Sequence, residues 1–453
     1  MTAHATHPLG APRPTIGVWQ GVSFLVGVVV GIGIFKTPQL VALNVDSGWE
    51  FLGLWLAGGL ITLIGALCYA ELGSARPHAG GEYRYLADAY GIRVGMLFAW
   101  ARGTVIQTGA IAAVAFVFGD YASRLLDLGA YSSAFYAMAA VIAVTALNLR
   151  GTMETTRAQT VLTTLTLCVL AAIVVAGWFW APSETPSAVA ESGSAGGAGA
   201  AGAWGLAMVF ILLTYGGWNE AAYLSGEVRN PSRNLVAILL LGSIVLMGIY
   251  LLVNLTYLNF FGLEGIRASD AIGADMMSRI AGPTGEIFLS LAVCAAAIST
   301  LNATIFTGAR AYSALGRDVP ALSRLGFWDA RGHHPVNAIL VQTAITLALV
   351  LFGAISRNGF ASMVEFSAPV FWFFLLLVGF SLFIFRMRTP AEKRPFSVPL
   401  YPLTPILFCL SCGYMLYSSL AYTGIGALIG VAVLLLGTPL LLLARRPMAV
   451  PAE

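Results

Sequence analysis

Charged residues are scarce in this chain. Only 10% of its 453 residues are Asp, Glu, Lys or Arg, whereas an ordinary soluble domain carries about 25%. Hydrophobic residues instead make up 58% of the chain, and the mean hydropathy is +0.82. This composition excludes a typical soluble domain and predicts that the lipid bilayer surrounds most of the protein. The formal net charge of +3 gives no indication of a nucleic-acid partner.

Cysteine is also rare, and its spacing carries no chemistry. All five cysteines fall within apolar stretches and lack the paired spacing of zinc or redox sites: Cys68, Cys168, Cys294, Cys409 and Cys412. We therefore expect no disulfide framework and no resident cofactor. The first fifteen residues lack the apolar core of a signal peptide, and we expect residues 1–15 to form a disordered cytoplasmic tail.

Long apolar runs are abundant. A helix needs about 20 mostly apolar residues to cross about 30 Å of hydrocarbon. Twelve runs meet this requirement and predict an all-α integral membrane protein with twelve transmembrane helices: 16–43, 51–76, 93–119, 131–149, 159–181, 204–226, 235–261, 284–308, 336–354, 362–386, 399–421 and 424–444.

The positions of the arginines predict the orientation. If the N-terminus is cytoplasmic, most arginines fall on the inner side, and only Arg124, Arg267, Arg279 and Arg357 fall on the outer side. Cytoplasmic loops carry an excess of Lys and Arg. We therefore expect both termini in the cytoplasm of a bacterial cell, with the chain in its inner (plasma) membrane.

Two of the runs are interrupted by glycine near their middles. Gly31-Ile32-Gly33 interrupts the first, and Gly216-Gly217 interrupts the sixth. Unwound backbone in a membrane needs protein or a water-filled cavity around it, because hydrocarbon cannot satisfy its N–H and C=O groups. Glycine pairs also allow close helix packing, but the coincidence of two breaks favours a binding site near the bilayer midplane.

The break in the first run has an electrostatic consequence. The half-helix that restarts after the break presents free N–H groups and the positive end of its dipole. Gly31, Ile32 and Gly33 are therefore expected to bind a carboxylate.

Four local patterns, in this order along the chain, carry a resemblance to a known family. They are Gly31-Ile32-Gly33-Ile34-Phe35; Tyr69-Ala70-Glu71-Leu72-Gly73 followed by Gly80-Gly81-Glu82-Tyr83; Tyr215-Gly216-Gly217-Trp218-Asn219 followed by Asn230-Pro231-Ser232-Arg233-Asn234; and Ala309-Arg310 followed by Gly316-Arg317-Asp318-Val319-Pro320. The chain resembles the amino acid–polyamine–organocation (APC) superfamily, closest to its L-type branch for neutral amino acids. The resemblance implies the LeuT fold, in which two inverted five-helix repeats have broken first and sixth helices and helices 11 and 12 are appended.

These expectations divide the chain into six parts. They are a disordered tail at 1–15, the first repeat at 16–181, a flexible external linker at 182–203, the second repeat at 204–386, helices 11 and 12 at 387–444, and a cytoplasmic tail at 445–453. The linker is rich in Gly, Ala and Ser, which is typical of a flexible segment.

The resemblance also implies how an amino acid would be held. Carbonyl groups of Val29, Leu213 and Gly216 would bind the ammonium group, with Gly217, Trp218 and Asn219 beside them. L-type relatives often carry a gating aromatic residue at the position of Leu213. Asn219 is neutral where antiporters of cationic amino acids commonly have an acid, which favours uncharged substrates. Trp218 is expected either to close the cavity or to pack against neighbouring helices.

Coupling to an ion depends on a second group of residues. Several sodium-independent relatives have a lysine at the position of Thr166, and that lysine is absent here. Ser299 and Thr300 match hydroxyl pairs that bind sodium in related proteins, with carbonyl groups of Gly27 and Val30 completing the site. Hydroxyls in membrane helices also commonly bond their own backbone. Coupling to Na+ or H+, or exchange without an ion, therefore stay open.

Other polar residues inside the runs have simpler interpretations. Glu71 is expected to pair with Arg76 or another arginine. Arg102 either faces the pathway or, in the favoured interpretation, extends toward the cytoplasmic interface. Glu220 lies about 100° from Asn219 on a helix and reaches the pathway only if the backbone there is irregular.

Together these features predict a secondary active transporter rather than an enzyme. We expect it to move neutral L-amino acids by alternating access, as an exchanger or an ion-coupled symporter. The alternatives are a cationic amino acid or polyamine antiporter of the same fold, and a non-transporting membrane sensor. No cysteine falls in a predicted outer loop, so we expect no covalently linked accessory subunit.

Overall fold

The computed structural model describes residues 16–78, 80–180, 200–225, 228–269, 271–329, 334–355, 359–390, 394–422 and 425–443. Regular structure within these ranges is helical, apart from two isolated β-bridges. The predicted tails at 1–15 and 445–453 and the linker residues 182–199 lie outside the described residues. Helix α9 begins at Ala200, inside the segment predicted as linker.

Most helices follow the predicted apolar runs. The helices of the N-terminal half are α1 (Val18–Val29), α2 (Gly33–Ala42), α3 (Gly48–Ala75), α4 (Glu82–Tyr90), α5 (Ile92–Ala101), the π-helix η1 (Arg102–Ile106), α6 (Gln107–Leu125), α7 (Ser132–Asn148) and α8 (Thr152–Phe179). The helices of the C-terminal half are α9 (Ala200–Thr214), the 3-10 turn η2 (Trp218–Glu220), α10 (Ala221–Leu224), α11 (Pro231–Arg267), α12 (Ile272–Asp318), η3 (Pro320–Gly326), α13 (Val336–Ile355), α14 (Gly359–Arg388), α15 (Leu403–Tyr422), α16 (Ile425–Leu435) and η4 (Thr438–Leu443).

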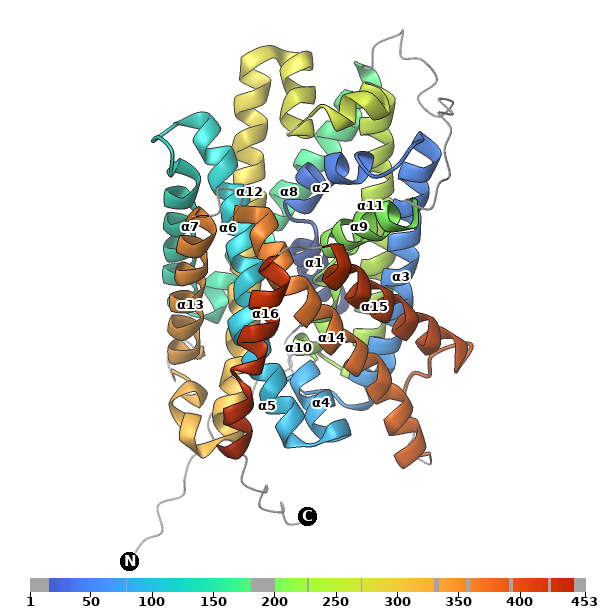
Figure 1. Ribbon diagram of the computed structural model, residues 1–453, viewed down its shortest axis with the longest axis vertical. Helices are drawn as coiled ribbons and strands as arrows, with labels where there is room; N and C mark the ends of the chain where they lie inside the picture. Colours follow the sequence, from blue (N-terminus) through green and yellow to red (C-terminus); the bar gives the residue numbers. More distant parts are fainter. Residues whose placement is uncertain are drawn as a thin grey trace, which may run out of the picture.

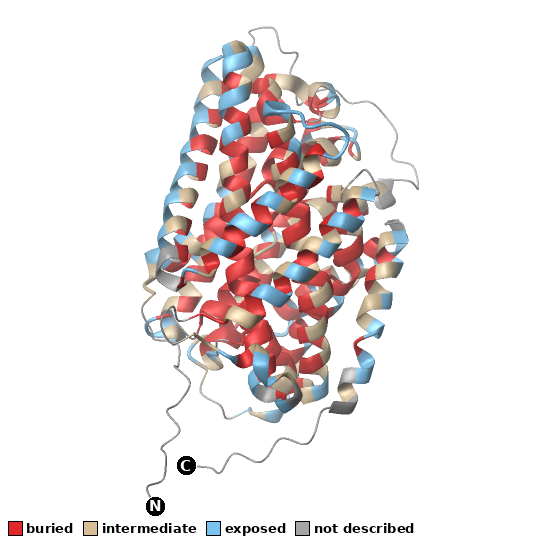
Figure 2. Ribbon diagram, turned by 90° about the vertical axis from the view of Figure 1, so that its left-hand side faces the viewer, coloured by how far each residue is buried: buried red, intermediate tan, exposed pale blue. Residues whose placement is uncertain are grey.

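The chain is a multi-pass membrane protein. Among the described residues, eight helical segments are long and apolar enough to cross a bilayer, and the bent pair α1–α2 adds a ninth. Exposed residues lie along the outward faces of the helices, and buried residues fill the centre (Figure 2). Many of the exposed side chains are large and apolar, for example Leu56, Val161 and Leu351, which suits contact with lipid rather than with water.

The short helices α1, α2, α9 and α10 lie in the middle of the bundle (Figure 1). Helix α1 packs against α8, α11 and α12, and α2 packs against α9 and α11. Two short gaps in helical structure therefore lie inside the protein, where longer helices surround them.

The two gaps have clear local causes. Val30 leaves the helical region with ψ 75°, and α1 and α2 are bent by 49° across residues 30–32. Helix α9 ends at Thr214, and Gly217 adopts φ +103°, which L side chains rarely adopt. The chain then continues as η2 and α10.

Candidate functional site

A cavity of about 170 Å³ lies where the two gaps meet. Residues of both gaps form its wall, together with residues of η1, α6, α12 and α14. Eight of the nine residues predicted to bind substrate line this cavity: Val29, Gly31, Ile32, Gly33, Leu213, Gly216, Gly217 and Asn219.

The ninth residue, Trp218, lies elsewhere. Its ring packs against Tyr69, with ring centroids 4.9 Å apart, and against Phe408, at 6.2 Å. Its six-membered ring also approaches Gly65, where an added Cβ would lie 2.6 Å from the indole. Of the two roles considered from the sequence, this position favours helix packing.

The glycines of the first gap are required by their neighbours. A Cβ on Gly31 would lie 2.5 Å from Oγ1 of Thr300, and a Cβ on Gly33 would lie 2.8 Å from the side chain of Thr214. Real Cβ atoms essentially never make contacts this short, so the gap closes tightly on α12 and on α9. Helix α2 restarts at Gly33, and the N–H groups of its first turn have no partner within their own helix.

A single tyrosine connects the two gaps. The hydroxyl of Tyr250 lies 2.7 Å from the carbonyl oxygen of Val29 and 3.1 Å from that of Thr214. Tyr250 is fully buried. The hydroxyl has one proton. When it donates to the nearer Val29 oxygen, which also accepts the N–H of Gly31 at 2.7 Å, both lone pairs of that oxygen are occupied. The Leu213 oxygen accepts the N–H of Gly216 at 3.0 Å.

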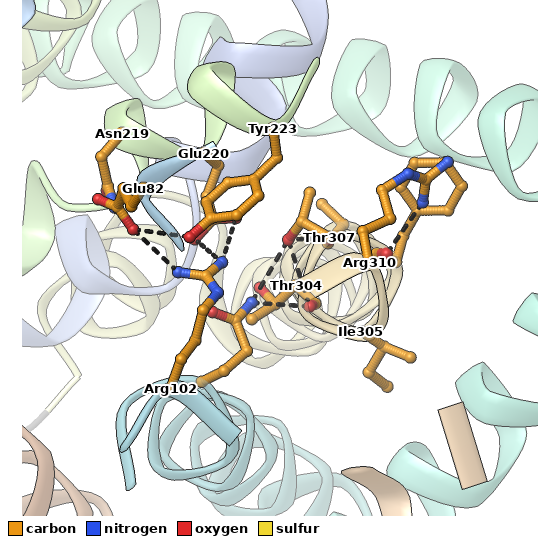
Figure 3. A network of polar contacts seen from close by, with 12 residues as sticks. Glu82, Arg102, Asn219, Glu220, Tyr223, Thr304, Ile305, Thr307 and Arg310 are labelled. Carbon is orange, nitrogen blue, oxygen red and sulfur yellow. Dashed lines mark hydrogen bonds and ion pairs between the residues drawn. The ribbon is translucent and has the colours of Figure 1, made fainter. Parts of the chain in front are cut away.

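A buried ionic cluster forms the wall beyond the second gap (Figure 3). Nη2 of Arg102 lies 2.8 Å from both carboxylate oxygens of Glu220, and Nη1 lies 3.4 Å from Oε2 of Glu82. The Arg102 side chain is only 2% exposed. Of the two positions considered from the sequence, Arg102 therefore occupies the one that faces the pathway, and it does not extend toward the cytoplasmic interface.

Glu82 lies at the centre of this cluster. Its Oε1 accepts from the hydroxyl of Tyr69 at 2.5 Å and from the amide of Asn219 at 2.9 Å, while its Oε2 accepts from the hydroxyl of Tyr223 at 2.9 Å. Glu82 belongs to the connecting helix α4. Desolvation by burial raises the pKa of its carboxyl, whereas Arg102 and the Tyr69 hydrogen bond act in the opposite direction.

Sequence reasoning missed this cluster as a unit. Arg102 and Glu220 were each considered alone, and Glu82 was seen only as part of a loop motif. A buried charge requires a partner of opposite sign. Arg102, near the middle of the third apolar run, could therefore have been matched with an intramembrane acid such as Glu220.

The side-chain amide of Gln159 lies beside two of the residues predicted to bind a cation, Gly27 and Ser299. Nε2 of Gln159 donates to Oγ of Ser299 at 3.0 Å and to Oγ1 of Thr163 at 3.3 Å. The atom nearest to a Cβ added on Gly27 would be Oγ1 of Thr163, followed by Nε2 of Gln159. Thr163 and Gln159, rather than Thr166, therefore face Gly27.

The remaining predicted cation ligands bond within their own segments or line the cavity. The hydroxyl of Thr166 donates to the carbonyl of Leu162 at 2.9 Å, and that of Thr300 donates to Ala296 at 3.3 Å. Thr300 also lines the cavity. Val30 is buried, and its N–H donates to the carbonyl of Val26 at 2.7 Å.

The orientation of Gln159 is fixed by a backbone carbonyl. Nδ2 of Asn302 donates to the carbonyl of Thr155 at 3.1 Å and to Oε1 of Gln159 at 3.0 Å. A carbonyl can only accept, so Asn302 must present its NH2 group to Gln159. The NH2 group of Gln159 must then point toward Ser299 and Thr163. A donor here competes with a cation for the same hydroxyl oxygens.

Comparison with known proteins decides the family. The profile of the amino acid permease family matches residues 16–436. The chain belongs to this family. The permease is 29% identical over 400 residues to the human b(0,+)-type amino acid transporter 1, covering 87% of this chain and 80% of the relative. It is 28% identical over 427 residues to the serine/threonine exchanger SteT of Bacillus subtilis (strain 168), covering 93% and 95% of the two chains.

A third relative of the permease carries a different substrate name. The human cystine/glutamate transporter is 27% identical over 419 residues, covering 90% of this chain and 82% of the relative. Permeases move their substrates chemically unchanged, so the protein is a transporter and not an enzyme.

Proposed function

We propose that this permease exchanges neutral L-amino acids across the inner (plasma) membrane by alternating access. The single observation that carries the proposal is the cavity between the two helix gaps, because residues on both sides of each gap line its wall: Val29, Gly31, Ile32, Gly33, Leu213, Thr214, Gly216, Gly217 and Asn219. Broken helices that meet at a cavity are the substrate sites of inverted-repeat transporters. The exchangers among the relatives, such as SteT, support the same activity.

We further propose a twelve-helix topology of LeuT type. The pairs α1–α2, α5–α6 and α9–α10 each count as one span, and α3, α7, α8 and α11–α16 supply the other nine. Both termini then lie in the cytoplasm. The bundle of α1–α2, α3, α9–α10 and α11 moves against α5–α6, α7, α12 and α13.

The substrate is held by main-chain groups at both of its ends. The carboxylate binds the N–H groups of Ile32 and Gly33 at the start of α2. The ammonium group binds carbonyls of Leu213 and Gly216 at the end of α9. The Val29 carbonyl joins them only when Tyr250 releases it, since both of its lone pairs are otherwise occupied.

We propose exchange without a coupled sodium ion. Gln159 presents an NH2 donor to Ser299 and Thr163, and a sodium ion at this position would need those oxygens as ligands. Transport that depends on a sodium or proton gradient in the same experiments would contradict this proposal. We also propose that the permease works without a disulfide-linked subunit, because four of its five cysteines are buried and the exposed Cys168 lies on the apolar helix α8.

Counterflow into proteoliposomes tests this function. Purified permease is reconstituted with an internal pool of one amino acid, and uptake of labelled neutral, cationic and acidic amino acids and of polyamines is measured. The proposal predicts rapid uptake of neutral amino acids only when the vesicles contain a neutral amino acid. Equal uptake into empty vesicles would contradict exchange, and preferential uptake of arginine or putrescine would identify a cationic antiporter. The absence of any flux would favour a sensor.

A further inference from the structure

The Nε–H of Arg102, in the ionic cluster, has no hydrogen-bond partner among the described residues. A guanidinium group carries five N–H donors, and the Nη atoms of Arg102 are engaged by Glu220 and Glu82. The Nε atom of Arg102 is buried and has no hydrogen-bond partner within the described part of the chain. Buried donors of charged groups are costly to leave unpaired. A free donor at this position therefore indicates an acceptor that a ligand supplies.

Arg102 belongs to the cavity wall. Arg102 and Glu220 both line the cavity that contains Gly31 and Gly217, whereas Glu82 and Tyr223 do not. The ring of Tyr223 covers the guanidinium at 4.2 Å. Arg102 is also the first residue of the π-helix η1, and π-helical turns commonly occur at functional sites. Tyr223 thus covers one face of the guanidinium, and Arg102 contributes to the cavity wall.

The charges around Arg102 select against charged ligands. Both carboxylate oxygens of Glu220 already accept hydrogen bonds from Arg102, so Glu220 binds a cationic side chain only weakly. Glu82 accepts from Tyr69, Asn219, Tyr223 and Arg102, which occupies the four acceptor positions of an ionised carboxylate. Two carboxylates then share one guanidinium, and their excess negative charge repels an anionic side chain.

We propose that Arg102 reads the substrate side chain, its Nε–H donating to an oxygen atom of an uncharged polar side chain such as that of serine, threonine, asparagine or glutamine. This inference rests on the proposed amino acid exchange and names the substrate class of the same cavity. Glu220 and Glu82 position the guanidinium and balance its charge. A side chain without an acceptor leaves the Nε–H unpaired and is transported less well.

Matched pairs of substrates test the inference on the unmodified permease. Threonine and valine have nearly the same shape, but threonine has a hydroxyl where valine has a methyl group. O-Methylserine likewise has an ether oxygen where norvaline has a methylene group. O-Methylserine accepts hydrogen bonds at its side chain but donates none. We expect kcat/KM for exchange to be about tenfold higher for the oxygen-bearing member of each pair, because the hydrogen bond involves a charged donor.

A substitution then assigns the effect to Arg102. Arg102→Lys keeps the positive charge for Glu220 but removes the Nε–H, so the threonine-to-valine ratio is expected to fall from about tenfold to about one. Arg310→Lys is the matched control. Arg310 is equally buried at 5% exposure, but it bonds the carbonyl of Phe306 and does not line the cavity. This control is expected to keep the ratio of the unmodified permease.

The outcomes separate the two proposals. If the reconstituted permease moves no amino acid, the proposed function fails. If it exchanges valine and threonine equally, or norvaline and O-methylserine equally, exchange stands and the role of Arg102 is refuted. A ratio that persists in Arg102→Lys also refutes it. If Arg102→Lys does not fold, the O-methylserine and norvaline measurement on the unmodified permease decides alone.

Discussion

Single residues explain why the two helix gaps lie so close together. Gly31 and Gly33 approach the threonines of α12 and α9 more closely than any side chain allows. The two glycines therefore permit close helix packing, and they also leave the backbone accessible. Tyr250 then joins the two gaps through its hydroxyl. The gaps are therefore one structural unit, and a change on one side is expected to be transmitted to the other.

Adding one methyl group at Gly33 tests this close approach. Gly33→Ala places a Cβ 2.8 Å from Thr214, and such overpacking costs about 1–3 kcal/mol. We expect at least an approximately tenfold loss of exchange. Gly53→Ala is the control, because no heavy atom lies within 4 Å of the added Cβ at Gly53. Normal exchange by Gly33→Ala in proteoliposomes would contradict the role of this gap.

Removing one hydroxyl tests the connection between the gaps. Tyr250→Phe keeps the ring and deletes the donor to Val29 and Thr214, at an expected cost of about 1 kcal/mol in stability. The Val29 carbonyl becomes available, so KM for substrate should change more than in the control. Tyr215→Phe is that control, since its hydroxyl bonds the carbonyl of Trp55 and its ring packs 4.9 Å from Tyr250. Identical kinetics in both variants would argue against a connecting role.

The residues that could be predicted from the sequence are those whose chemistry is local. Glycine in the middle of an apolar run signals a break wherever it occurs, and eight predicted gap residues do line the cavity. The Arg102, Glu82 and Glu220 cluster joins residues from three distant segments. No local pattern encodes that pairing. The same reason explains Gln159, whose contact with Ser299 depends on how α8 packs against α12.

At the scale of elements, a second ionic contact ties the ends of neighbouring helices together. Glu71 of α3 pairs with Nε of Arg386 at 2.8 Å, while Arg394 lies 3.5 Å away and the N–H of Val398 donates at 2.7 Å. Of the partners predicted for Glu71, Arg76 or another arginine, the second is found, and Arg76 lies over the ring of Phe385. Glu71 therefore fastens the segment between α14 and α15 to α3.

Neutralising this carboxylate is expected to loosen the segment. Glu71→Gln removes a buried acceptor from two arginines and a backbone N–H, which costs about 3 kcal/mol for a buried pair. The melting temperature of the purified permease should fall by several degrees. Glu264→Gln breaks the Arg267 pair, in which the Glu264 side chain is 74% exposed, and should leave the melting temperature unchanged. Equal melting temperatures for both variants would show that Glu71 is dispensable for stability.

Helices were predictable as elements because hydrophobic runs of sufficient length leave few other solutions in a bilayer. Their irregularities were not predictable. The π-helix at Arg102–Ile106 depends on packing against neighbours, whereas the kinks at Gly262 and Gly282 lie at glycines with positive φ and open space around an added Cβ. The run predicted at 284–308 begins just after the kink at Gly282, where two helical parts of α12 meet, but the helix continues past 308 to Asp318, because hydropathy marks the membrane and not the end of a helix.

At the scale of the whole molecule, the proposed ion-free exchange depends on the side-chain amide of Gln159. This amide lies where the sequence alone suggests a sodium ion. Asn148, Asn302 and Gln159 form a chain of amide hydrogen bonds between α7, α12 and α8. Each amide is oriented by the previous one. The chain ends on the hydroxyl of Ser299, where the sequence alone suggested a sodium ligand.

Replacing sodium tests this arrangement directly. Exchange of neutral amino acids is expected to proceed at the same rate in sodium, potassium and choline media, because Gln159 already satisfies Ser299 and Thr163. The measurement uses proteoliposomes at constant ionic strength with the membrane voltage clamped. A control without internal amino acid reports leak. A rate that rises with sodium concentration under these conditions would show that an ion displaces the amide.

The amide of Gln159 has a consequence for the cell that carries this permease. Under the proposed obligatory, ion-free exchange, the carrier draws no energy from an ion gradient, and each molecule that enters is matched by one that leaves. It can enrich one amino acid only by depleting another, and the total pool stays constant. Biosynthesis or a separate uptake system must therefore supply the amino acid that is given away.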